Sequence, residues 1–300
     1  MLGIEIRDRV VVAVSLAGDG RVLVRAERPL AGDGLADAAL AALDAARAGA
    51  SAGDAASSVG VALAGPDVAP AAELLRAVAA RYAGSRVSAE PIPSGTGAAV
   101  AEAWVGAARG VRDSVFFSVA DHATAGIVRD GVPWLGARRH AASIAWLALN
   151  PVEREDYRKT GCLEAEVASA GIVRRLIWRI KAGDRSRVAD QVGGDFQAIT
   201  IDHVLDAARQ GDGVSISVMR DTAKYIGMAA ANLVAVTDPE LLVLGGILAS
   251  AADVLLEPVR VEIARRLPRT MSDALRIEPA LLGDDAPAIG AARLAAGPAA

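Results

Sequence analysis

The feature that most constrains the fold of this 300-residue chain is a pattern of three short strands that occurs twice. Each copy has three runs of β-branched and apolar residues, with a turn after the first run and a glycine-containing turn after the second. The runs cover residues 3–6, 10–15 and 21–24 in the first copy and 114–119, 124–128 and 132–134 in the second. Because the second copy follows about 110 residues after the first, the pattern predicts two related lobes.

Helical patterns alternate with further strands after each copy. The spacing of apolar residues predicts helices over 35–47, 70–82, 201–210 and 216–236, and buried strands over 58–63 and 241–244. This alternation predicts an α/β chain with mostly covered mixed sheets. We place the N-terminal lobe at 1–110, completed by a C-terminal helix at 286–296, and the second lobe at 111–285.

The composition excludes several classes of protein. With 53% hydrophobic and 23% charged residues, the chain buries a core and is not disordered as a whole. Lys and Arg number 32 against 36 Asp and Glu, so the net charge of −4 predicts no general affinity for nucleic acid. The longest runs without these charged residues have 13 residues, whereas a membrane helix needs about 18. The N-terminus lacks the basic and apolar regions of a signal peptide, so we expect a cytoplasmic protein.

Several segments resemble the ROK (repressor, open reading frame, kinase) family. They are Ile201–Asp212, Asp221–Met228, Asn232–Val234 and Asp238–Gly246, with Glu102–Ala107 and Gly161–Glu164 fitting the same template. The resemblance runs from Gly3 to about Ala295. It implies the two-lobed α/β sugar-kinase/actin-like (ribonuclease H-like) fold, with a duplicated β-β-β-α-β-α unit and an interlobe cleft. It also implies a homodimer, and either ATP-dependent hexose phosphorylation or sugar-responsive repression.

The resemblance places the first phosphate turn of the family, D-I-G-G-T-K, on residues 5–10. Glu5 keeps a carboxylate there, but Arg7 and Asp8 replace both glycines. Asp8 adds bulk and negative charge where a triphosphate must pass, although Arg7 and Arg9 could hold an anion.

The second phosphate turn, G-T-G-V-G-A-G in the family, falls on residues 120–126. Asp121 and His122 enter this turn, and one glycine of four remains. His122 beside a carboxylate could act as a base, but an exposed turn histidine is the favoured interpretation. Farther on, Gly245 and Gly246 match the adenine-side turn of the family; they serve either a ligand ring or tight packing between strand and helix.

The sugar side of the resemblance has changed as well. The Asn-Asp pair that holds the sugar and supplies the base falls on Pro93 and Ser94, and a serine hydroxyl is a poor proton acceptor. The Glu and His that contact sugar hydroxyls fall on Ser143 and Trp146. The indole of Trp146 could stack on an apolar or ring-shaped ligand. Glu90 lies just upstream and could serve as a displaced base.

A zinc site of the family is lost by the same alignment. The family uses a histidine and three cysteines of a C-x-C-G-x-x-G-C string, where this chain has Trp146, Glu155, Tyr157 and only Cys162. A structural zinc site needs about four nitrogen or sulfur ligands, so we expect no metal. We expect Cys162 to be a small buried residue, and the segment 150–160 to be held by packing or by its own charges.

A basic stretch follows this segment, on a helix that also carries isoleucines and leucine. Its members are Arg174, Arg175, Arg179, Lys181, Arg185 and Arg187. Without an aromatic ladder, a solvated helix face is favoured over a nucleic-acid patch. The repressors of the family carry a winged helix-turn-helix before the first strand. This chain begins two residues before that strand, so we expect no direct DNA binding. We also expect no membrane partner.

Two hypotheses remain. The first is a catalytically silent member of the family that binds a small molecule or acts in regulation or assembly, with no cofactor. The second is a divergent kinase that transfers phosphate from Mg-ATP to an alcohol group of an unusual sugar, amino sugar or cyclitol, with Glu90, Asp121 or His122 as base. The residues expected around the ligand are Glu5, Arg7, Asp8, Arg9, Pro93, Ser94, Asp121, His122, Ser143, Trp146, Gly245 and Gly246.

Overall fold

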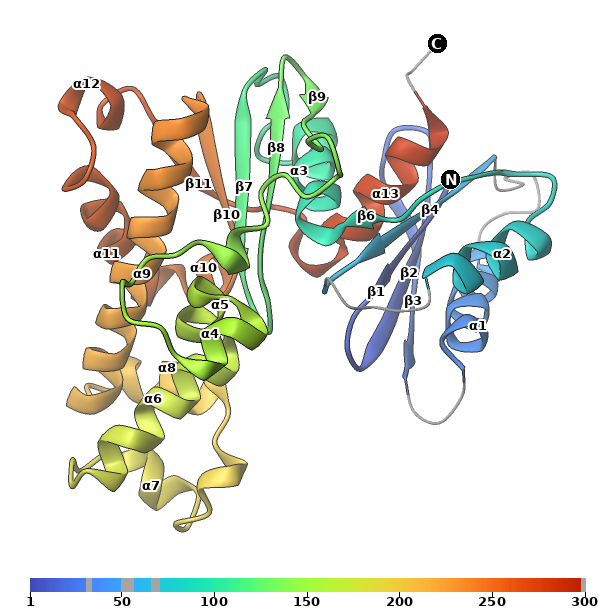
Figure 1. Ribbon diagram of the computed structural model, residues 1–300. Coiled ribbons are helices and arrows are strands. Elements are labelled where there is room, and N and C mark those ends of the chain that lie inside the picture. The colour runs from blue at the N-terminus through green and yellow to red at the C-terminus, as the bar shows by residue number, and fades with distance from the viewer. Residues whose placement is uncertain (31–33, 50–56, 66–70, 298–300) are drawn as a thin grey trace. The chain divides into compact units, whose positions relative to one another are not determined.

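The computed structural model describes residues 1–30, 34–49, 57–65 and 71–297 (Figure 1). By its contacts the chain separates into two compact units. Unit 1 comprises Met1–Phe116, Ala125–Ala142 and Ala280–Ala300, and unit 2 comprises Phe117–Thr124 and Ser143–Pro279. None of the described helices is both long and apolar enough to span a membrane.

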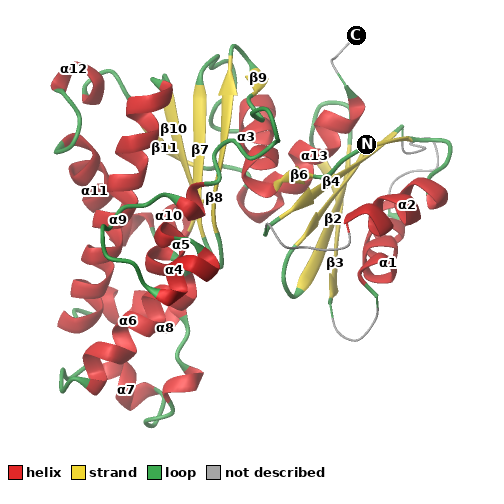
Figure 2. Cartoon of the chain, viewed as in Figure 1, coloured by secondary structure: helices red, strands yellow, loops and turns green. Residues whose placement is uncertain are grey.

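The first sheet has the strand order β3-β2-β1-β4-β5, with β6 also paired to β4. Its strands are β1 (Leu2–Ile6), β2 (Val10–Leu16), β3 (Val22–Pro29), β4 (Ser58–Leu63), β5 (Arg86–Val87) and β6 (Ile92–Pro93). Figure 2 draws the strands in yellow and the helices in red. β1 pairs antiparallel with β2 and parallel with β4. The expected meander is therefore present, and the strand expected at 58–63 is confirmed.

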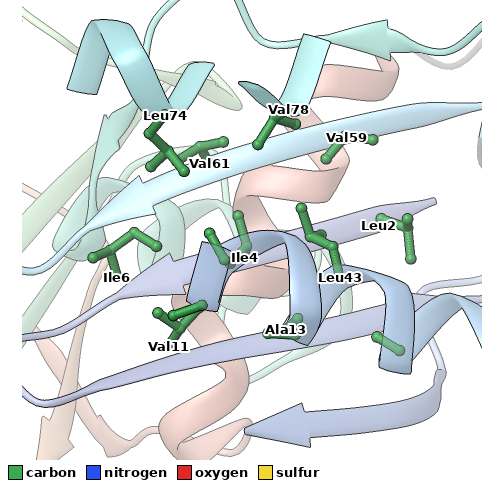
Figure 3. Close-up of a cluster of buried hydrophobic side chains, with 14 of the residues drawn as sticks. Leu2, Ile4, Ile6, Val11, Ala13, Leu43, Val59, Val61, Leu74 and Val78 are labelled. Carbon is green, nitrogen blue, oxygen red and sulfur yellow. The ribbon is translucent and has the colours of Figure 1, made fainter. Parts of the chain in front are cut away.

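Strand β1 is buried on both faces. Its alternating side chains therefore pack into two different parts of unit 1. Leu2, Ile4 and Ile6 point into a core that α1 (Leu35–Ala48) and α2 (Ala71–Arg81) complete with Leu43 and Leu74 (Figure 3). The other face of β1 carries the residues between them, because successive side chains of a strand point to opposite faces. Residue 70, where the second helix was expected to begin, lies outside the described residues.

The opposite face of the first sheet is covered by α13 (Ala286–Ala296), which contacts β1, β4 and α3 (Ser94–Val105). Glycines allow backbone to meet backbone there. A Cβ at Gly3 would lie 1.9 Å from the Ala288 carbonyl oxygen, and a Cβ at Gly290 would lie 1.8 Å from the Gly97 carbonyl oxygen. The C-terminal helix therefore belongs to the core of unit 1 and positions both β1 and the start of α3.

The second sheet repeats the order of the first. Its order is β11-β10-β7-β8-β9, so in both sheets the first strand of the meander lies between the second strand and a later one. The strands are β7 (Ser114–Val119), β8 (Ala123–Arg129), β9 (Val132–Pro133), β10 (Leu241–Gly246) and β11 (Arg276–Pro279). The duplication predicted from the sequence is therefore confirmed at the level of topology.

Unit 2 is mostly helical. Its central helix is α9 (Gly213–Thr237), which contacts α5, α6, α8 and α11 (Figure 1). It begins earlier than its apolar spacing indicated because the Asp212 carboxylate caps it by accepting from the Ser215 N–H at 2.8 Å. The other helices are η1 (Ile144–Trp146), α4 (Glu155–Thr160), α5 (Cys162–Val167), α6 (Ser169–Lys181), α7 (Arg187–Gln191), η2 (Phe196–Ala198), α8 (Ile201–Arg209), α10 (Ile247–Ser250), α11 (Ala252–Ala264) and α12 (Arg269–Ser272).

Candidate functional site

In unit 1, the first phosphate turn contains an internal ion pair. The Glu5 side chain lies on the face of β1 that α13 covers, and the residue is only 3% exposed. The Arg7 Nε donates to the Glu5 carboxylate at 2.7 Å. The same guanidinium donates to the Asp284 carbonyl oxygen at 2.5 Å, and its Nη1 lies 3.8 Å from the Asp284 carboxylate. Arg7, which the sequence suggested as an anion ligand, is thus already engaged by two residues of its own chain.

Ser94, the residue that the resemblance aligns with the family's catalytic base, begins α3. It is 4% exposed, and its hydroxyl makes no hydrogen bond of good geometry. Burial raises the pKa of Glu5 above its ordinary value of 4.5, against the opposing effects of the Arg7 charge and of the nearby Ser94 hydroxyl. Glu5 and Ser94 therefore form one buried polar cluster, in which the carboxylate belongs to β1 and the base position holds an alcohol.

The raised pKa of Glu5 has a consequence for stability. A group with a raised folded-state pKa contributes stability below its unfolded pKa and loses that contribution as pH rises through the folded value. The protein should therefore lose part of its stability as pH rises from about 4.5 towards neutrality, and Glu5→Gln should flatten that decline. Urea denaturation at several pH values measures how the free energy of unfolding changes with pH. Glu73→Gln, at an exposed position of α2, is the control. An unchanged slope in Glu5→Gln would contradict this assignment.

The other expected residues of unit 1 lie apart from this buried cluster. Asp8 and Arg9 are exposed. Glu90 is 63% exposed and its carboxylate lies 3.2 Å from the Arg139 Nε, so it is a surface ion pair. Pro93 pairs with β4 through β6 and precedes α3, which makes it a structural residue of the strand-to-helix turn.

In unit 2, the second phosphate turn is tied to α5 by a carboxylate. The His122 Nδ1 lies 3.3 Å from Glu164 Oε1, and the Ala123 N–H donates to Glu164 Oε2 at 2.9 Å. The His122 side chain is 22% exposed, so the expectation of an exposed turn histidine is wrong. Asp121 remains exposed at the same turn. Glu164 therefore orders a turn that the family builds from glycines.

Tight packing, one of the two uses considered for Gly245 and Gly246, explains the glycine at position 246. Gly246 has φ +63°, and a Cβ there would lie 2.1 Å from the Val119 carbonyl oxygen. Any side chain would separate β10 from β7. Gly245 is buried within β10.

The sugar-contact positions of unit 2 carry exposed side chains. Ser143 is exposed, and Trp146 is 49% exposed at the end of η1. Gly161 packs beneath this turn, since a Cβ there would lie 2.2 Å from the Ala145 carbonyl oxygen. Trp146 thus presents its indole at the surface of unit 2 and is not held in the core.

The positions of the zinc ligands are occupied by a packed and ion-paired segment. Tyr157 and Cys162 are buried with Ala165, and the partly buried Leu149 packs against them, which confirms the expected burial of the thiol. The Tyr157 hydroxyl donates to Glu166 Oε1 at 2.5 Å, and burial raises the pKa of this phenol. One thiol and one phenol do not fit a tetrahedral zinc site. Ion pairs complete the segment: Arg154–Asp156, Arg158–Glu153 and Lys159–Glu155.

The expectation of a solvated basic face is wrong for part of α6. The Arg174 and Arg175 side chains are 34% and 17% exposed. The Arg175 Nη2 donates to the Glu166 carbonyl oxygen at 2.6 Å and to the Thr222 hydroxyl at 2.9 Å. These guanidiniums turn inwards, towards α5 and α9.

Sequence reasoning missed the acidic residue that holds α3 in place. Glu102 is fully buried, and its Oε1 accepts from the Leu281 and Leu282 N–H groups at 3.0 Å each. Its Oε2 accepts from the Ala107 N–H at 2.7 Å. The available signal was a lone Glu inside an otherwise apolar helix, where burial without partners is too costly.

The comparisons with known proteins agree on one family. A model of the ROK family matches residues 95–297, and the chain belongs to this family. Over 199 residues it is 32% identical to a glucokinase from Halalkalibacterium halodurans, covering 64% of this chain and 59% of that protein. Over 162 residues it is 28% identical to the N-acetylglucosamine repressor of Escherichia coli O157:H7, covering 54% of this chain and 38% of that protein.

The fold agrees with a solved structure along the whole chain. A crystal structure of a ROK family glucokinase from Streptomyces griseus, in complex with glucose and AMPPNP, superposes with a TM-score of 0.81. The sequence identity is 23%, and 98% of each chain is covered. The α/β sugar-kinase/actin-like fold is therefore confirmed. The sequence match to the Halalkalibacterium halodurans glucokinase spans about three fifths of that protein's length.

Proposed function

We propose that this protein is a catalytically silent member of the ROK family that binds a small molecule or acts in regulation or assembly. The observation that carries the proposal is the buried cluster of unit 1. Arg7 is neutralised by Glu5 and Asp284, and the base position holds the Ser94 hydroxyl.

Phosphoryl transfer needs donors that are free to hold the phosphate and a base for the acceptor hydroxyl. A triphosphate at this turn would have to compete with Glu5 for the Arg7 guanidinium, and it would bring negative charge beside the exposed Asp8 carboxylate. The residues present at the first turn therefore do not fit Mg-ATP in the manner of the family. A serine at the base position forfeits about 10²- to 10⁴-fold in rate.

The test is a nucleotide titration. With Mg-ATP the melting temperature should stay within about 1 °C of that of the free protein, because a ligand that does not bind the folded state adds no stability. A saturating ligand at 100 times its Kd would add about 2.7 kcal/mol, which corresponds to a shift of several degrees. Release of ADP, measured with hexose, amino-sugar and cyclitol acceptors, should remain at background. Turnover above background would contradict the proposal.

One observation favours a second candidate, a divergent kinase. His122 and Glu164 form a histidine–carboxylate pair at the second phosphate turn, an arrangement that suits acid–base chemistry. In this candidate the acceptor is an alcohol of an unusual sugar, amino sugar or cyclitol, and the phosphate donor is Mg-ATP.

The second candidate has its own discriminating variant. Any ADP release should be lost in His122→Gln and retained in His203→Gln. His203 is a suitable control because it completes the capping box of α8 with Thr200, and glutamine can take the same role. Loss of turnover in both variants, or in neither, would exclude His122 as the base.

The homodimer implied by the family resemblance stays a prediction. Light scattering of the purified protein measures it directly, with twice the mass of one chain as the expected result. A single-chain mass at micromolar concentration would contradict it.

A further inference from the structure

A cavity of about 510 Å³ lies in unit 2, beside helices that carry none of the expected catalytic positions. From α6 it is lined by Gly171, Arg174, Arg175 and Trp178. These residues are spaced i, i+3, i+4 and i+7, so they form a single face of the helix. This is the face that the sequence alone suggested to be solvated.

Helix α9 presents a matching face to the same cavity. Its lining residues are Asp221, Lys224, Tyr225 and Met228, again at i, i+3, i+4 and i+7. α6 and α9 are in contact along part of their length (Figure 1). Around the cavity, charged and aromatic side chains occupy positions that apolar side chains would fill in an ordinary helix pair.

The charges around this cavity are unbalanced. Among the described lining residues five are cationic, namely Arg154, Arg174, Arg175, Lys224 and Arg266, and two are carboxylates, Glu166 and Asp221. Each of the five cations has a carboxylate within 4 Å, and two further carboxylates that do not line the cavity, Asp156 and Glu262, supply part of this pairing. The interior surface therefore offers more donors for an anion than acceptors for a cation.

Two of the arginines keep unused donors. The Nε atoms of Arg174 and Arg175 are buried and have no hydrogen-bond partner. Burial also lowers the pKa of Arg175, against the opposing effect of the Glu166 charge. A buried guanidinium with an unsatisfied N–H costs free energy, and rotation of either side chain to bring its Nε to an oxyanion in the cavity would remove that cost.

Aromatic rings hold these guanidiniums in fixed planes. The Arg154 and Arg174 guanidiniums lie 5.2 and 5.3 Å from the ring centre of Trp178. The Arg175 guanidinium lies 5.8 Å from the ring centre of Tyr225. Cation–π contact orders the arginines before a ligand arrives, which reduces the entropy lost on binding.

We propose that the cavity between α6 and α9 binds a small molecule through an oxyanion group, either a carboxylate or a phosphate. The guanidiniums of Arg174 and Arg175 suit both groups, because each oxyanion presents two oxygens to paired N–H donors. The oxyanion would share donors that now bind the Ala165 and Glu166 carbonyl oxygens and the Asp156 and Glu166 carboxylates. The site does not depend on whether the chain phosphorylates a sugar, since neither Ser94 nor His122 lines it.

Calorimetric titration tests the site and separates the two sources of oxyanion. Citrate supplies carboxylates, inorganic pyrophosphate supplies phosphates, and sodium chloride at matched ionic strength accounts for general charge screening. We expect one of the two anions to bind at one site per chain, and Arg174→Gln to weaken that binding at least tenfold. Saturation by citrate alone would assign a carboxylate ligand, and saturation by pyrophosphate alone would assign a phosphate.

Arg179→Gln is the matched control. Arg179 lies on the same helix, pairs with Asp184, and does not line the cavity. Its removal should leave the affinity unchanged. Equal weakening in Arg174→Gln and Arg179→Gln would overturn the proposal, as would the absence of binding by both anions.

Two further variants cover the case in which Arg174→Gln fails to fold. Lys224 is 49% exposed, so Lys224→Gln removes a cation at little structural cost and should also weaken binding. Trp178 is 51% exposed at the cavity, and anion binding should change the tryptophan fluorescence. That change should vanish in Trp178→Phe and persist in Trp134→Phe. A fluorescence change that survives in Trp178→Phe would place the anion elsewhere and overturn the proposal.

Discussion

Replacing Gly60 by alanine is expected to lower the free energy of unfolding by about 3 kcal/mol. Gly60 lies on β4, and a Cβ there would be 1.9 Å from the Ala291 carbonyl oxygen and 2.1 Å from the carbonyl carbon. Both atoms belong to the backbone of α13, so no side-chain rotation can make room. The helix would have to move away from the sheet and give up its close packing along β1 and β4.

Gly84→Ala is the control for this experiment. A Cβ at Gly84 would meet no atom within 4 Å, so this variant should change stability by no more than about 0.5 kcal/mol. Urea denaturation followed by circular dichroism compares the two. If Gly60→Ala unfolds at the same urea concentration as Gly84→Ala, then α13 does not pack on β4 as described.

Truncating Glu102 is expected to have an effect of similar or larger size. Glu102→Ala leaves the N–H groups of Ala107, Leu281 and Leu282 without their acceptor, and it opens a small cavity inside unit 1. Hydrogen bonds to a charged acceptor contribute about 1.5–3 kcal/mol each, so a loss of about 4 kcal/mol is expected. The segment before α13 then loses its attachment to the end of α3.

A graded series isolates the role of the carboxylate. Glu102→Gln keeps one acceptor oxygen and should lose about half as much stability as Glu102→Ala, whereas Glu73→Ala on the exposed side of α2 should lose little. Hydrogen exchange of the Leu281 and Leu282 amides supplies a local measurement. Unchanged protection of these amides in Glu102→Ala would show that the carboxylate is not their partner.

Much of the fold could be predicted because its signals are local. The alternation of Leu2, Ile4 and Ile6 follows the period of a strand, and the i, i+3, i+4 spacing along α9 follows the period of a helix. The repeated strand pattern predicted two related lobes, and the two sheets have the same strand order. Cys162, expected as a small buried residue, is buried.

The candidate site could be predicted only in part. The sequence identified which residue types stand at the phosphate turns and at the base position, and from them came the expectation of lost catalysis. It did not reveal that Arg7 contacts Asp284, 277 residues away, or that His122 contacts Glu164, 42 residues away. It also placed the α6 arginines in solvent, although Arg174 donates to α5 and Arg175 donates to both α5 and α9.

The sequence by itself determined the repeated strand pattern, the buried strands over 58–63 and 241–244, the helices with regular apolar spacing and the chemical identity of every side chain at the expected site. The tertiary structure alone decided which charges meet: Glu5 with Arg7 and Asp284, Glu164 with His122, and Glu102 with the segment before α13. The physical reason is the distance along the chain between the residues that interact. Backbone periodicity is fixed by neighbours a few residues apart, whereas a buried charge finds its partner only when distant segments pack together and desolvation makes that partner necessary.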